Sequence, residues 1–190
     1  MEARLNVSGV EVLITSISRD GGEVGSVVMS RDGVYRYGLS RCWDVHDVAA
    51  VEARPVVVML NPSTADHAED DGTIRRVRGL LARDGHAGVF VVNLFAYRTR
   101  SPVKLLAAPD PEGPANLEFV RSVVTERNDV PVIAAWGAHG SKPRVGLVVD
   151  KLTAMLDGTD WQCWGTTKDG DPCHPLYLPA STRLRPWRQP

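Results

Sequence analysis

The chain has 190 residues, a length that fits one domain with a sizeable hydrophobic core. Hydrophobic residues make up 43% and charged residues 24% of the chain, and the net charge of −1 excludes a uniformly basic coat for nucleic acid. No apolar run approaches ~20 residues and no basic start precedes an apolar stretch, so we expect neither a membrane span nor a secretory signal.

The cysteines are few and scattered. Cys42, Cys163 and Cys173 form no C-x-x-C pair, which argues against a disulfide framework and against a zinc or iron–sulfur site built on thiolates. We therefore expect a cytoplasmic protein.

Residues 10–43 alternate between apolar and polar positions and contain two hairpin signals. Asp20-Gly21-Gly22 and Asp32-Gly33 interrupt the alternation, as the turns between antiparallel strands do. We predict an antiparallel meander of two or three strands along one edge of the core.

From residue 55 onward, short apolar runs alternate with segments of helical periodicity. Strands are predicted over 55–60, 88–95, 131–137 and 160–167, and helices over 72–85, 114–127 and 144–158. Residues 101–114 are read as the longest irregular stretch. This order predicts an α/β fold with a central four-stranded parallel sheet flanked by helices. The whole chain 1–190 is expected to be a single domain, with the meander 10–43 as an extension and 55–180 as the core.

Polar residues follow each of the four predicted strands. Asn61-Pro62-Ser63 follows the first strand, Asn93 lies near the end of the second, Trp136-Gly137 ends the third, and His174 comes after the fourth. Ligands of open parallel sheets bind where the carboxyl ends of the strands meet their loops. We therefore expect the two asparagines and the histidine to converge on one small pocket.

These motifs resemble the uracil-DNA glycosylase superfamily. "VVMLNPS" is similar to its first motif, "GVFVVNLFAYR" to the strand that ends in the base-reading asparagine, and "HPLYL" lies where its His-Pro-Ser-Pro-Leu motif would be. The chain is also similar to a bacterial and phage-associated family of unknown function that carries Asn-Pro-Ser-Thr-Ala-Asp and His-Pro-Leu-Tyr. Order and spacing agree over roughly residues 55–180. The chain departs from the glycosylases in lacking Ser-Pro after His174-Pro175.

The resemblance implies a monofunctional DNA glycosylase, acting in base excision or phage defence, that hydrolyses the N-glycosidic bond of a flipped pyrimidine. In that reading Asn61 orients the attacking water, Asp66 supplies a negative charge or accepts its proton, and His174 donates to an oxygen of the leaving base. The small residues Ser63, Thr64 and Ala65 suggest room for a substituent at the 5-position of the base.

The remaining candidate residues would hold the base and the DNA. Predicted base contacts are Pro62, Ser63, Asn93, Phe95, Tyr97 and Trp136. Predicted DNA contacts are Arg75, Arg76, Arg98, Lys168, Leu176 and Tyr177, with the last two forming an apolar wedge. We expect DNA, single- or double-stranded, as the partner, a monomeric protein, and no cofactor.

Several alternatives remain open. Asp66, Glu69, Asp70 and Asp71 could hold Mg²⁺, although Asp70 or Asp71 is better suited to cap the helix that starts near Gly72. The same fold could serve an enzyme that processes nucleosides or nucleotides or modifies a base, or a non-catalytic module that binds nucleic acid.

Overall fold

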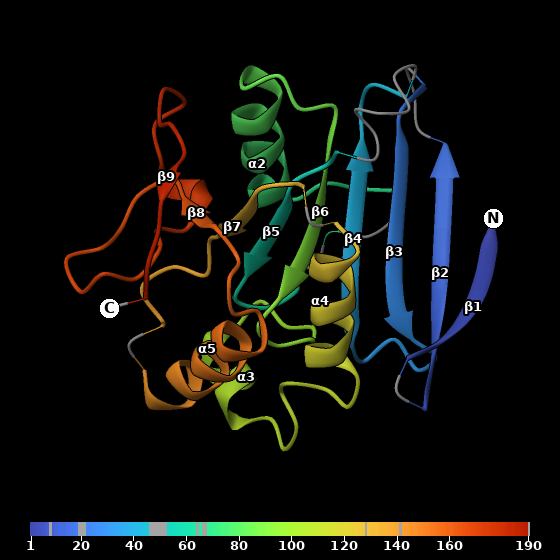
Figure 1. The fold of residues 1–190 in the computed structure, drawn as a ribbon. Helices are drawn as coiled ribbons and strands as arrows, with labels where there is room; N and C mark the ends of the chain where they lie inside the picture. Colours follow the sequence, from blue (N-terminus) through green and yellow to red (C-terminus); the bar gives the residue numbers. More distant parts are fainter. Residues whose placement is uncertain are drawn as a thin grey trace.

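A computed structural model of the chain describes residues 1–7, 9–18, 22–45, 53–63, 65, 68–127, 129–140 and 142–189. Within these residues, nine strands form one mixed sheet in the order β1-β2-β3-β4-β6-β5-β7-β8-β9 (Figure 1). The strands are β1 (Glu2–Val7), β2 (Val10–Ser18), β3 (Val24–Ser30), β4 (Arg36–Cys42), β5 (Val56–Met59), β6 (Gly88–Asn93), β7 (Val132–Ala134), β8 (Trp161–Cys163) and β9 (Arg185–Pro186). The helices are α2 (Gly72–Arg83), α3 (Pro102–Ala107), α4 (Asn116–Thr125), α5 (Pro143–Met155) and the 3₁₀ helix η2 (Pro175–Tyr177).

The prediction of a central four-stranded parallel sheet flanked by helices is wrong. Strands β6, β5, β7 and β8 do pair in parallel, but they are less than half of a mixed sheet that continues without a break through the antiparallel strands β4, β3, β2 and β1. The four α-helices of the described residues are short, with 6 to 13 residues each. The meander therefore belongs to the same sheet as the parallel strands and contributes four of the nine strands of the described residues.

Strand β4 joins the two halves. Leu39, Ser40 and Arg41 pair antiparallel with Val91, Phe90 and Val89 of β6, and every residue of β4 is buried. Its two arginines are buried together with their partners, since Arg36 donates to the Ala65 carbonyl and Arg41 pairs with Asp70.

Each face of the sheet has its own core. On one face α2 buries Ile74, Val77, Leu80 and Leu81, the apolar positions expected from the helical spacing. On the other face α4 and α5 pack on Val56, Val58 and Val92. Each fully buried aliphatic side chain contributes roughly 1.5–3 kcal/mol relative to an exposed one. This burial fixes β5 and β7 in the middle of the sheet, where their carboxyl ends open into loops.

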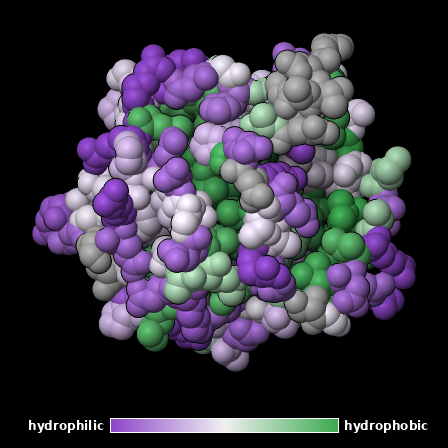
Figure 2. Space-filling model, viewed as in Figure 1, coloured by the Kyte–Doolittle hydropathy of each residue, from purple (hydrophilic) through white to green (hydrophobic). Residues whose placement is uncertain are grey.

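The two ends of the described chain lie at opposite edges of the sheet, with β1 at one edge and β9 at the other (Figure 1). Figure 2 shows apolar surface over the antiparallel strands. Val7, Val10 and Ile14 of β1 and β2 are half-buried and pack against the core. None of the helices in the described ranges is long and apolar enough to cross a bilayer.

Candidate functional site

A cavity of about 560 Å³ lies where β5 and β7 end. Ligand pockets in proteins commonly enclose ~300–1,000 Å³. The polar side chains along its wall come from seven separate stretches of the chain: Arg36, Asn61, Ser63, Asp71, Thr73, Thr99, Arg100, His139, Thr167, Cys173, His174 and Tyr177. Asn61 and His174, which are 113 positions apart in the chain, thus share one cavity.

The Asn61 side chain is held in one orientation. Its Nδ2 donates to the carbonyl oxygens of Pro62 at 3.0 Å and Thr99 at 2.7 Å, and the Thr99 N–H in turn donates to the Pro62 carbonyl at 3.1 Å. Both amide hydrogens are therefore used, and Oδ1 has no hydrogen-bond partner among the described residues. An amide fixed in this way presents only an acceptor to a ligand or a water molecule.

His174 is the N-cap of η2. Its Nδ1 accepts a hydrogen bond from the backbone N–H of Leu176 at 3.3 Å. Nδ1 must be unprotonated to accept, so in the neutral imidazole the proton is on Nε2, which becomes a donor. Burial lowers the pKa of His174 below its ordinary value of 6.5, the Asp71 carboxylate acts in the opposite direction, and His139 lowers the pKa further. At pH 7 the group is thus a neutral Nε2–H donor.

Gly137 allows His174 to pack close to the end of β7. Its φ is +79°, and a Cβ at this position would lie 3.2 Å from the Cβ of His174. The Gly137 N–H also donates to the Pro172 carbonyl at 2.9 Å, which ties the segment before His174 to the sheet. Glycine is needed here both for the left-handed backbone and for the close approach.

Several polar residues of the cavity, among them Arg36, His139 and Asp71, were not assigned a role there from the sequence. Arg36 lies in β4 and is 3% exposed, and its Nη1 donates to the Ala65 carbonyl. His139 follows β7, and burial lowers its pKa as well. Asp71 caps α2, accepting from the backbone N–H groups of Thr73 and Ile74 at 2.9 Å each. The order of strands across the sheet, which the sequence does not reveal, brings Arg36 to this place.

The predicted base contacts divide into two groups. Ser63 lines the cavity, and Trp136 reaches its wall while its ring lies in an aromatic cluster with Trp161 and Trp187 at centroid distances of 6.2 and 5.1 Å. Pro62 is buried behind Asn61 and is not among the described lining residues.

Asn93, Phe95 and Tyr97 are not on the cavity wall, and this corrects the expectation that both asparagines line it. Asn93 is 1% exposed, is the register partner of Met59, and its buried Nδ2 has no hydrogen-bond partner among the described residues. Phe95 is fully buried in the core, and Tyr97 stacks edge-on against Tyr35. The strand β6 is covered on both faces, so the residues that end it turn inward instead of toward the loops.

The predicted DNA contacts are also divided. Leu176 and Tyr177 are exposed by 40% and 83%, and Tyr177 lines the cavity beside the His174 ring, at a centroid distance of 5.8 Å. Lys168 is exposed on a nearby turn. Arg98, in contrast, donates to the Gly33 carbonyl at 3.0 Å and thus binds the meander.

The two arginines predicted on the first helix both lie on α2. Arg75 is exposed, but its Nη1 donates to the Asp70 carbonyl, and Arg76 is half-buried. Neither lines the cavity.

The assignments to Thr64 and Asp66 lie outside the described residues. The alternative of a magnesium site on the acidic segment meets two competing contacts, since Asp70 forms an ion pair with Arg41 at 2.6 Å and Asp71 caps α2. Within the described part of the chain, no group of three or more His, Cys, Asp or Glu side chains is placed to hold a metal ion.

Comparison with known proteins assigns the chain to a family. No curated protein and no solved structure matches the chain significantly. The family match extends from the first residue of β4 into η2 and so includes the described polar residues of the cavity except Tyr177. Residues 36–176 match DUF1643, a family described as a protein of unknown function, and the chain belongs to that family.

Proposed function

We propose that the protein is a DNA glycosylase that hydrolyses the N-glycosidic bond of a pyrimidine flipped out of DNA. The observation that carries this proposal is the pairing, in one cavity, of a fixed acceptor with a fixed donor. Asn61 offers Oδ1 after both its amide hydrogens are used, and His174 offers Nε2–H after its Nδ1 is used.

This pair suits the chemistry of base excision. When the bond between C1′ and the base nitrogen breaks, its electron pair leaves with the base, and negative charge develops on the base oxygens. A neutral Nε2–H donor stabilises this charge without releasing a competing proton, and an amide acceptor orients the water that attacks C1′. Products are an abasic site and the free base.

The surroundings of the cavity also fit a base drawn from DNA. Tyr177 is 83% exposed at the cavity wall and Leu176 beside it is 40% exposed, which suits side chains that fill the gap left by an extruded nucleotide. Extrusion costs a few kcal/mol, and such filling and stacking offsets part of it. The volume of about 560 Å³ leaves room for a substituent on the base, as the small Ser63 beside Asn61 also suggests.

The direct test is incubation with single- and double-stranded oligonucleotides that carry uracil or a 5-substituted pyrimidine at one position. Abasic sites are detected by alkaline strand cleavage. We expect cleavage for at least one base, and a loss of about 10²–10³-fold for His174→Ala, as for removal of other donors to a developing oxyanion. A similar loss is expected for Asn61→Ala. His86→Gln is the matched control, because His86 is half-buried but lies away from the cavity. No abasic site with any base of the panel would refute the proposal.

A second comparison separates a DNA enzyme from one acting on free nucleosides. The double variant Leu176→Ser, Tyr177→Ser removes the exposed apolar side chains and leaves His174 in place. A DNA glycosylase should lose more activity on duplex than on single-stranded substrate, because only the duplex leaves a gap to be filled. Equal activity of variant and wild type on duplex DNA, together with hydrolysis of free nucleosides, would favour the small-molecule enzyme.

A further inference from the structure

Asp71 is the only acidic residue among the described residues that line the cavity. The sequence left the helix cap open between Asp70 and Asp71, and Asp71 is the residue that caps α2. Capping uses Oδ1, which accepts from both Thr73 and Ile74. The second oxygen, Oδ2, has no hydrogen-bond partner in the described parts of the chain. A carboxylate oxygen on a cavity wall is therefore available for chemistry.

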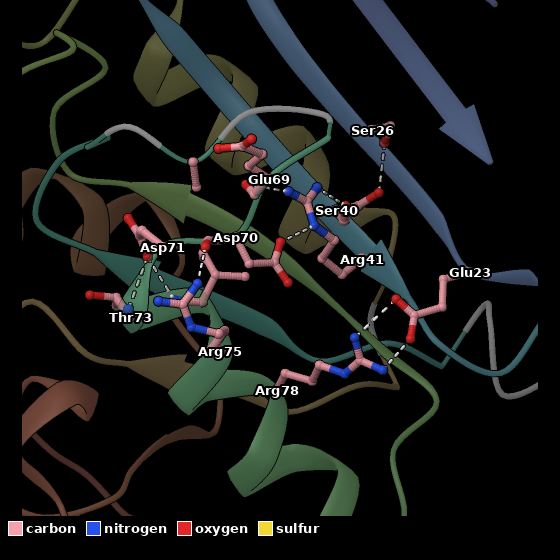
Figure 3. A network of polar contacts seen from close by, with 12 residues as sticks. Glu23, Ser26, Ser40, Arg41, Glu69, Asp70, Asp71, Thr73, Arg75 and Arg78 are labelled. Carbon is pink, nitrogen blue, oxygen red and sulfur yellow. Dashed lines mark hydrogen bonds and ion pairs between the residues drawn. The ribbon is translucent and has the colours of Figure 1, made fainter. Parts of the chain in front are cut away.

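The neighbouring acid explains why Asp71 faces this way. Asp70 is 8% exposed in its side chain and binds Nε of the buried Arg41 at 2.6 Å, while the Glu69 carbonyl accepts from Nη2 of the same arginine at 3.2 Å (Figure 3). Arg75 holds the Asp70 carbonyl. Asp71 has an extended backbone with φ −78° and ψ 176°, and consecutive side chains of an extended segment point to opposite sides. Fixing Asp70 toward β4 thus turns Asp71 toward α2 and the cavity.

The same helix start places Asp71 near His174. A Cβ on Gly72, the residue after Asp71, would lie 3.5 Å from Cδ1 of Leu176. Leu176 is the second residue of η2, and His174 caps that helix. The carboxylate and the imidazole therefore approach the cavity from two elements that pack on each other.

We propose that Asp71 is a catalytic residue of this cavity, the base that takes the proton of the attacking water, with Arg41 as the residue that positions it. This inference rests on the proposed glycosylase function. As the C1′–N bond breaks, the carboxylate also stabilises the positive charge that develops on the sugar. The water oxygen then bonds to C1′, one water proton passes to Asp71, and the departing base takes up a proton from solvent. The carboxylate afterwards releases its proton to water, which restores the site.

The electrostatics of the cavity agree with this arrangement. The Asp71 charge raises the pKa of His174, although burial is the larger cause and lowers it overall. The other described titratable or charged groups along the wall are Arg36, Arg100, His139, Cys173 and Tyr177. Among these, His139 lowers the pKa of His174. Removing the Asp71 charge should therefore shift the His174 titration in a defined direction.

The test compares Asp71→Asn and Asp71→Ser with the wild type. Asparagine and serine are both good N-cap residues, so each variant keeps the acceptor for the α2 backbone and removes the charge. We expect the excision rate to fall by on the order of 10²-fold or more in both, as when a general base is lost. We also expect the pKa of His174, followed by NMR of its ring protons, to fall in both variants. Asp150→Asn on the exposed side of α5 is the control and should change neither quantity.

The readouts separate the inference from the proposed function. Wild-type excision rates in Asp71→Asn would overturn the catalytic role and leave the glycosylase proposal intact. Absence of excision by the wild-type protein would refute the glycosylase proposal and with it the role of Asp71 in that reaction. The His174 titration needs no substrate, so an unchanged His174 pKa in Asp71→Asn would overturn the pairing of the two groups in either case.

Discussion

The antiparallel and the parallel halves of the sheet differ in how they treat polar side chains. In the antiparallel half, Ser26 and Ser40 share a hydrogen bond of 2.6 Å, and Arg41 is held by Asp70. In the parallel half, Oδ1 of Asn61 and Nε2 of His174 have no partner among the described residues. Both residues are half-buried and line the cavity, so a ligand or a water molecule there can supply the missing contact.

Tyr37 is an exception within the antiparallel half. Its hydroxyl is buried without a hydrogen-bond partner in the described residues, and burial raises its pKa to about 12. It lies among Tyr35 and Phe119, away from the cavity. Unpaired polar atoms therefore indicate a binding site only where they line a cavity. The antiparallel half contributes to that cavity through Arg36, which lines it, and through Arg41, which holds Asp70 next to Asp71.

The largest expected effect comes from breaking that support at Arg41. Arg41→Met leaves the Asp70 carboxylate buried without its cation, and breaking a buried pair in this way costs about 3–5 kcal/mol. The free energy of unfolding, measured in urea, should fall by this amount. Arg4→Met is the matched control: Arg4 pairs with Glu11 at 3.5 Å with 70% of its side chain exposed, so the change should cost less than about 1 kcal/mol.

A second substitution sharpens this prediction. Arg41→Met combined with Asp70→Leu removes both charges, and apolar replacements of a buried ion pair are often close to neutral. We therefore expect the double variant to regain most of the stability. A double variant as unstable as Arg41→Met alone would show that the arginine stabilises the fold through its side-chain hydrogen bonds to the backbone carbonyls of Ser40 and Glu69. The ion pair would then contribute little.

Much of the parallel half could be predicted from the sequence, because its signals are local. The helix expected over 72–85 is α2, with Asp71 as its cap, and the apolar runs became β5, β6, β7 and β8. Asn61 and His174 meet because carboxyl ends of parallel strands share one edge of a sheet.

What the sequence missed depends on contacts between distant segments. The extent of the sheet follows from β4 pairing with β6, and the burial of Arg41 from an acid 29 positions away. Asn93 turns inward because β6 is covered on both faces. The short helix α3 had a local signal that was passed over, since Ser101 caps it and Pro102 is its first residue.

An intermediate effect is expected from Gly137→Ala, which changes the parallel half directly. A left-handed backbone costs an L-residue about 1–2 kcal/mol, and here the new Cβ also meets the Cβ of His174 at 3.2 Å. Gly158→Ala has a similar φ of +81° but nothing within 4 Å of the new Cβ, so it measures the backbone strain alone. We expect both variants to be destabilised in urea, and Gly137→Ala alone to lose excision activity. Equal activity of the two would mean that the position of His174 tolerates displacement.

The smallest expected effect is the pH dependence of stability between pH 7.5 and 5.5. Burial lowers the pKa values of His86, His139 and His174 below 6.5, so the unfolded chain binds protons that the folded chain does not. The stability that these neutral histidines contribute is fully present above pH 6.5 and is lost as the pH falls below 6.5 through their lowered pKa values. Asp32, in the antiparallel half, has a pKa lowered from 3.8, so its contribution is lost only in a more acidic range.

Urea unfolding at pH 7.5, 6.5 and 5.5 tests this separation of the two halves by pH. We expect the free energy of unfolding to decrease from pH 6.5 to 5.5 by less than Arg41→Met or Gly137→Ala decreases it. The decrease should be smaller in His174→Gln, which cannot take up a proton, and unchanged in Asp32→Asn. A pH dependence that persists in His174→Gln but disappears in Asp32→Asn would place the titrating groups in the antiparallel half and contradict the contrast between the halves.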